Sequence, residues 1–179
     1  MAAASIRFGG GIVTRRVVVS AGQTGYRHQL DRTRRFLERI EESYEELGDM
    51  DPVVFQDNMW SFFQHCWHVK DWVRNDPIVP QATKDLVVTD AEQSRTLTIC
   101  QDLCNGTKHL KLRTPQSGAG ASTKHIEMTI APEVGRLEMD CIVDDGNGKD
   151  LSGKALARDC LKAWEQILIN RGLATGRLS

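Results

Sequence analysis

The chain has 179 residues, of which 40% are hydrophobic and 26% charged, a composition typical of one soluble globular domain. Its 23 basic and 24 acidic side chains nearly cancel, so the net charge favours neither nucleic acids nor membrane surfaces, and only a local basic patch could do so. The apolar runs are far shorter than the ~20 residues of a membrane-spanning helix, and arginines interrupt the N-terminal segment before a signal sequence is formed. We therefore expect a cytoplasmic protein that does not enter the membrane.

The first part of the chain, residues 1–24, differs from the rest. Two β-prone runs, Ser5–Phe8 and Ile12–Val19, are separated by glycines 9–11. Such runs bounded by glycine predict a strand or an irregular arm. Residues 25–179 form the expected helical domain.

Helical periodicity then dominates up to residue 109. An amphipathic helix is predicted over Tyr26–Leu47, with Gly48 as its stop. A second helix is predicted over Pro52–Arg74, capped by Asp51, and three of the four tryptophans lie in it. Because this helix is apolar on most of its circumference, we expect it at the centre of a bundle. A third helix is predicted from about Thr89 towards residue 109.

Two alternating apolar stretches between about residues 124 and 144 predict an antiparallel β-hairpin. A last helix follows, with Ser152 as its cap and Asn170–Gly172 as its end. The predicted fold is therefore mainly α: a bundle of about four helices, with the hairpin before the last helix and either a strand or an irregular arm at the N-terminus.

Five cysteines are scattered along the chain without Cys-x-x-Cys spacing, so we expect reduced thiols rather than disulfides. The nearest approach to a ligand set is Cys100, Cys104 and His109 in one predicted helix beside His65, Cys66 and His68 in another. Zinc accepts such ligands, but no spacing of a zinc motif is present, and thiols at apolar positions pack as small hydrophobes. The sequence therefore predicts neither a metal nor a cofactor.

A first candidate site lies in the second predicted helix, where His68 precedes Asp71 by three residues. This spacing places both on one helix face, and a histidine oriented by a carboxylate is the arrangement that general-base catalysis needs. The alternative, favoured by the apolar character of this helix, is that the two side chains satisfy each other's hydrogen bonds inside a bundle.

A second candidate site is the end of the third predicted helix, where Asn105 and His109 lie four residues apart and Lys108 adds positive charge. Such a cluster can bind a phosphate, with His109 as acid or base. The favoured alternative is a C-cap, in which Asn105 and Gly106 end the helix while Lys108 and His109 complement its dipole.

Two long helices, a third that ends in an Asn-x-x-x-His segment and a final helix resemble the HEPN superfamily. Its members are small helical bundles, and many are metal-independent ribonucleases that work as dimers. Asn105 and His109 match the Asn and His of the family motif, whereas Cys104 stands where the motif has Arg. The resemblance implies an inactive relative, or a site in which another cation such as Lys108 or Arg95 stabilises the charge on phosphate. Segments 67–72 and 105–109 also resemble parts of small bacterial proteins.

Since no complete catalytic motif is present, we expect a non-enzymatic binding or interaction module with a protein partner or a second copy of itself. The alternative is a HEPN-like metal-independent ribonuclease or RNA-binding protein. Its site would be His109, Asn105 and Lys108, with His68 and Asp71 as neighbours.

Overall fold

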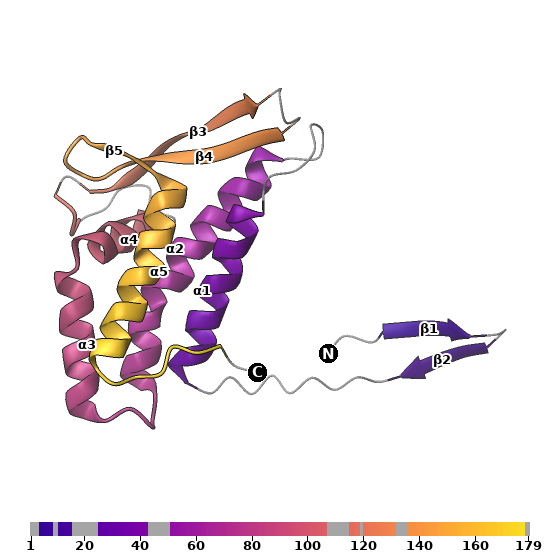
Figure 1. The fold of residues 1–179 in the computed structure, drawn as a ribbon, viewed down its shortest axis with the longest axis horizontal. Helices are drawn as coiled ribbons and strands as arrows, with labels where there is room; N and C mark the ends of the chain where they lie inside the picture. The colour runs from indigo at the N-terminus through magenta and orange to yellow at the C-terminus, as the bar shows by residue number, and fades with distance from the viewer. Residues whose placement is uncertain are drawn as a thin grey trace.

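A computed structural model describes residues 4–8, 11–15, 25–42, 51–106, 115–118, 120–131 and 136–177. Within them, five helices form a bundle, and a three-stranded sheet lies across one end of it (Figure 1). The prediction of a mainly α fold is confirmed, with one helix more than expected. Near the N-terminus, β1 (Ala4–Phe8) pairs antiparallel with β2 (Gly11–Arg15), so this segment holds a hairpin rather than one strand.

Helices α1 (Tyr26–Glu41) and α2 (Pro52–Asn75) pack against each other. Asp51 caps α2 as predicted, because its Oδ1 accepts a hydrogen bond of 2.8 Å from the Val53 N–H, and Pro52 occupies the first turn. Besides α1, α2 contacts α3, α4, α5 and β4, which confirms its predicted central position. The predicted end of the first helix, with Leu47 and Gly48, lies outside the described residues.

The prediction of a single third helix from about Thr89 is wrong. The structure has α3 (Gln81–Gln93) and α4 (Arg95–Gly106), separated by Ser94 in an extended conformation. Only Val87 and Ala91 of α3 are buried, so its sequence carries little apolar periodicity from which the helix could be recognised.

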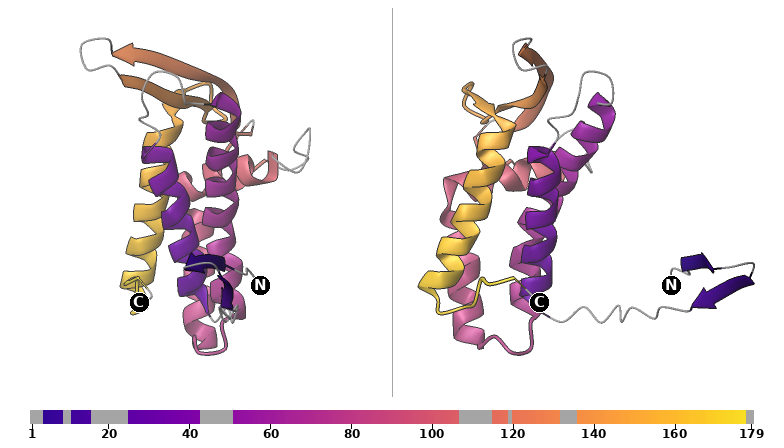
Figure 2. Two further views of the ribbon diagram at one scale, coloured as in Figure 1. Left: turned by 90° about the vertical axis from the view of Figure 1, so that its right-hand side faces the viewer. Right: turned by 45° about the vertical axis from the view of Figure 1, so that its right-hand side comes forward.

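The predicted hairpin at about 124–144 is confirmed as β3 (Ser122–Ala131) paired with β4 (Arg136–Asp144), and its turn lies outside the described residues. A third strand, β5 (Asp150–Ser152), was not predicted, because three residues are too few to show alternation. Met139, Cys141 and Val143 of β4 are buried and face the helices. Figure 2 shows the sheet beside the first turns of α5.

Helix α5 (Gly153–Asn170) begins at the predicted cap, where Ser152 Oγ accepts a hydrogen bond of 3.1 Å from the Ala155 N–H. After α5 the chain returns to α1, and the Tyr26 hydroxyl donates a hydrogen bond of 2.8 Å to the Ala174 carbonyl. None of the helices among the described residues combines the length and apolar character needed to cross a membrane.

Candidate functional site

The arginines of α1 divide between two sides of the helix. Arg34 is buried and pairs with Asp31 and Glu165 at 2.8 and 2.6 Å, and it also donates to the Thr175 carbonyl. Arg32, Arg35 and Arg39 lie on the other side, towards α2, and no carboxylate among the described residues lies within ion-pair distance of them. These three cations are therefore available to an external anion.

Aromatic rings lie between these arginines and α2. The ring of Phe36 stacks on His65 with 4.9 Å between the centroids, and Arg39 lies 4.9 Å above the same Phe36 ring. Arg32 lies 6.0 Å from the centre of the Trp72 ring. We call the surface formed by Arg32, Arg35, Phe36 and Arg39 of α1 with His65 and Trp72 of α2 the arginine face.

His65, which is half-buried within the arginine face, has a lowered pKa. Burial first, and then the charges of Arg32, His68 and Arg35, lower this pKa from 6.5 to about 4. The ring is therefore neutral at neutral pH. Gln29 fixes it in place, since its Nε2 lies 3.2 Å from His65 Nδ1 and donates a hydrogen bond of 2.7 Å to the His65 carbonyl. The positive character of the arginine face thus comes from its arginines.

A pocket of about 730 Å³ adjoins the arginine face at the C-terminal end of α2. Its lining is Gly25, Asp71, Trp72, Asn75, Asp76, Pro77 and Ile78. Trp72 belongs to both the pocket and the arginine face, so a ligand in the pocket lies next to Arg32. We call this hollow the Trp72 pocket.

Asp76 builds the floor of the Trp72 pocket. Its carboxylate accepts hydrogen bonds of 2.9 Å from the Tyr26 N–H and 3.0 Å from the Ile78 N–H, which ties the start of α1 to the turn after α2. Gly25 is required beside it, because its φ is +83° and a Cβ there would lie 2.5 Å from the carboxylate. With Asp76 engaged in this way, Asp71 is the pocket carboxylate to which no described residue donates a hydrogen bond.

The structure places the predicted site residues on two different helices. His68 and Asp71 lie one turn apart on α2, both half-buried, with Asp71 in the lining of the Trp72 pocket and His68 beside His65. Asn105 is half-buried in the last turn of α4, and Cys104 beside it is fully buried. Lys108 and His109 lie outside the described residues, so their convergence with Asn105 stays a prediction.

Sequence reasoning missed the arginine face, although its signal is present. Arg32, Arg35 and Arg39 recur at steps of three and four residues, which places them on one side of a helix. It also missed that Cys66 and Cys100 meet Cys160, because three separate helices bring these thiols together. Neither Cys104 nor His65 belongs to that group.

Compared with protein-family models, curated proteins and solved structures, the chain has no significant match.

Proposed function

We propose that the chain is a non-enzymatic binding module whose arginine face and Trp72 pocket bind single-stranded nucleic acid, RNA in the first place. The observation that carries this proposal is the set of three arginines that face α2 without a carboxylate partner among the described residues, next to an aromatic ring that lines an open pocket. Phosphate groups and stacked bases are the two features that such a surface recognises.

Phosphates are assigned to Arg32, Arg35 and Arg39. The guanidinium group donates paired hydrogen bonds to phosphate oxygens and keeps its charge at any physiological pH. The first and last of these arginines are seven positions apart along the helix, a distance of about 10 Å, so the three side chains span more than one phosphate. Because the net charge of the whole chain is −1, binding depends on this local patch.

A base is assigned to the Trp72 pocket. Trp72 offers an indole ring for stacking, and Arg32 nearby adds a cation to the same ring. Asp71 supplies acceptors for the amino or imino groups of a base edge, and the Asn75 side chain is held in place by a hydrogen bond of 2.8 Å to the Asp71 carbonyl. Stacking of a base on an aromatic side chain contributes about 1–3 kcal/mol.

The test is fluorescence anisotropy of labelled single-stranded RNA, single-stranded DNA and duplex RNA with the purified chain. We expect the wild type to bind single-stranded RNA, and the triple variant Arg32→Gln, Arg35→Gln, Arg39→Gln to bind at least about tenfold more weakly at low salt. Because three phosphate contacts are removed, the plot of log affinity against log salt concentration also becomes less steep, its negative slope shrinking by about 2.

The matched control removes three cations from other surfaces, Lys84→Gln, Lys149→Gln and Lys162→Gln, and so changes the net charge equally. We expect little change in affinity or in salt slope. A control variant that loses as much affinity as the arginine variant would contradict the assignment to α1. Within the pocket, Trp72→Ala is expected to weaken binding by about 1–3 kcal/mol, while Trp72→Phe keeps most of the affinity.

A second candidate function is the HEPN-like metal-independent ribonuclease. The half-buried position of Asn105 at the end of α4 is compatible with it. Its site would comprise Asn105, Lys108 and His109, with His68 and Asp71 as neighbours. Cleavage of the same RNA in EDTA by the wild type, lost in His109→Ala, would establish this activity, whereas intact RNA in both samples would support the binding module.

The proposed compartment is the cytosol, which is supported by five cysteines that form no disulfide. A protein partner, or a second copy of the chain in a homodimer, is the alternative occupant of the arginine face. Size-exclusion chromatography of the wild type and of the triple arginine variant distinguishes it, because a partner on this face makes the assembly depend on Arg32, Arg35 and Arg39.

A further inference from the structure

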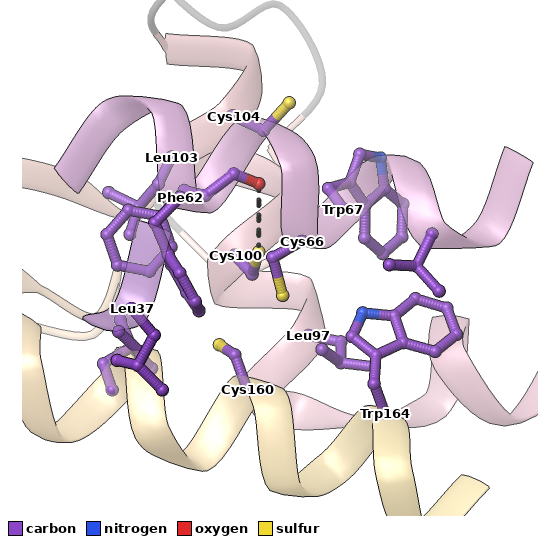
Figure 3. Packing of buried hydrophobic residues seen from close by; sticks show 14 of the residues in the cluster. Leu37, Phe62, Cys66, Trp67, Leu97, Cys100, Leu103, Cys104, Cys160 and Trp164 are labelled. Atoms are coloured by element: carbon purple, nitrogen blue, oxygen red, sulfur yellow. Dashed lines mark hydrogen bonds between the residues drawn. The ribbon is translucent and has the colours of Figure 1, made fainter. Parts of the chain in front are cut away.

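Three buried thiols meet at the centre of the bundle. Cys66 of α2, Cys100 of α4 and Cys160 of α5 are each 0% exposed, and their sulfur atoms all lie within 4.8 Å of one another. Figure 3 shows them converging from three helices, while the sulfur of Cys104 lies apart from them. We call Cys66, Cys100 and Cys160 the cysteine cluster.

A second feature of the core points to a ligand at the same place. The Trp164 side chain is 0% exposed, and its indole N–H has no hydrogen-bond acceptor at normal distance among the described residues. Its nitrogen lies on the side of the ring that faces the cysteine cluster (Figure 3). A buried donor without an acceptor costs about 1–3 kcal/mol, and a thiolate at Cys66 would supply that acceptor.

Two of the three thiols make hydrogen bonds that suit their protonated form. Cys100 Sγ donates to the Phe63 carbonyl at 3.5 Å, and Cys160 Sγ donates to the Thr96 carbonyl at 3.6 Å. These contacts tie Cys100 to α2 and Cys160 to α4, and both sulfur atoms lie within 4.8 Å of the Cys66 sulfur. The cluster is thus held in position by backbone carbonyls before any ion binds.

We propose that the cysteine cluster binds one thiophilic metal ion, copper(I), through three thiolates. Binding forms three metal–sulfur bonds and releases the three thiol protons to solvent. Metal–thiolate bonds are about 2.3 Å long, so three sulfurs around one ion in a plane lie about 4.0 Å apart. The observed spacing of at most 4.8 Å therefore needs only a small contraction.

Copper(I) is favoured over zinc by the number of ligands. Zinc in structural sites is almost always tetrahedral with four protein ligands, whereas the cluster among the described residues offers three. Soft thiolates select copper(I), and the apolar surroundings exclude the water that would complete a zinc site. The Trp164 N–H offsets part of the negative charge that the three thiolates bring into the core.

The test loads the full chain during refolding, because the cluster is buried in the folded state. Reduced protein is unfolded in guanidinium, refolded without oxygen in the presence of copper(I), and freed of loose copper with a chelator. We expect one copper per chain by elemental analysis, three sulfur ligands by X-ray absorption, and a higher Tm than that of the metal-free protein. A parallel zinc sample is expected to lose its metal to the chelator.

The controls lie in the same chain, since Cys104 and Cys141 are equally buried but outside the cluster. Cys66→Ser, Cys100→Ser and Cys160→Ser are expected to lose the copper, while Cys104→Ser and Cys141→Ser retain it. Circular dichroism establishes that each variant folds. The proposal is overturned if the wild type refolds without retaining copper, if its Tm does not rise, or if retention depends on Cys104 or Cys141.

Discussion

At the scale of single residues, the fold changes the acid–base chemistry of side chains that sit beside one another on α2. Burial and the charges of Arg32, His68 and Arg35 make His65 a weaker base, while the neighbouring Cys66 points into the core. The Cys66 sulfur is met there by the sulfurs of Cys100 of α4 and Cys160 of α5. The same two neighbours, Cys100 and Cys160, have raised pKa values, chiefly because burial penalises their charged forms.

The lowered pKa of His65 makes stability depend on pH in a defined direction. The unfolded chain takes up a proton at this histidine near the ordinary pKa of 6.5, whereas the folded protein does so only near 4. The stability present above pH 6.5 is therefore lost as the pH falls from 6.5 towards 4. From about pH 7 to about pH 5, we expect the free energy of unfolding to fall by about 1 kcal/mol more in the wild type than in His65→Gln, after allowance for solvent screening.

Urea unfolding at the two pH values measures this difference. Glutamine is a suitable replacement, because it does not titrate and its side-chain oxygen can accept the hydrogen bond from Gln29. Equal pH dependence in the wild type and in His65→Gln would show that burial and the neighbouring cations together do not lower the pKa of His65.

At the scale of elements, the junction of α5 with the sheet depends on one glycine. A Cβ on Gly153 would lie 2.7 Å from the Cys141 carbonyl oxygen of β4 and 2.7 Å from the Met59 methyl group of α2. The methyl group can move, but the carbonyl belongs to the strand ladder. The absence of a side chain at this position therefore sets how closely α5 approaches β4.

Gly153→Ala is accordingly expected to destabilise the protein by about 1–3 kcal/mol, as overpacking of a core does. The control is Gly106→Ala at the end of α4, where a Cβ would meet nothing within 4 Å among the described residues. This change is expected to be neutral or stabilising, because alanine favours helix. Thermal unfolding followed by circular dichroism compares the two. A stable Gly153→Ala protein would mean that α5 can shift away from β4 at little cost.

The elements that could be predicted from the sequence are those with local signals. The caps at Asp51 and Ser152 were found because capping depends on residues within one turn of the helix start. The break at Ser94 was not found, since α3 buries only two side chains and is held mainly by packing against its neighbours. Of the cysteine cluster, the sequence placed Cys66 and Cys100 on neighbouring helices, but the third thiol, Cys160, is brought to them only by the packing of α5.

At the scale of the whole molecule, α2 connects the two proposed sites. His65 and Trp72 face the arginines of α1, and Cys66 of the same helix joins the cysteine cluster on the core side. Helix α2 therefore has a proposed binding surface on one side and the core on the other, and it is held by contacts with α1, α3, α4, α5 and β4. Helix α3 is different, because it is anchored by few buried side chains and leaves Leu86 46% exposed.

This contrast predicts how the backbone opens in the native state. Amides in the middle of α2, around Phe62–Val69, are expected to exchange hydrogen only through global unfolding, so their exchange free energies equal the total stability. Amides of α3 are expected to exchange through local opening, with free energies lower by about 2 kcal/mol or more, because separating α3 exposes little apolar surface. Native-state hydrogen exchange at increasing urea measures both exchange free energies. Helix α4 serves as the internal comparison, since it packs on α2 and buries Leu97, Cys100 and Leu103.

If α3 exchanges as slowly as α2 and α4, the helices form one cooperative unit and α3 is held by more than its buried side chains. If α3 opens alone, the stable part of the molecule is α2 with its surrounding partners, and both proposed sites lie within it.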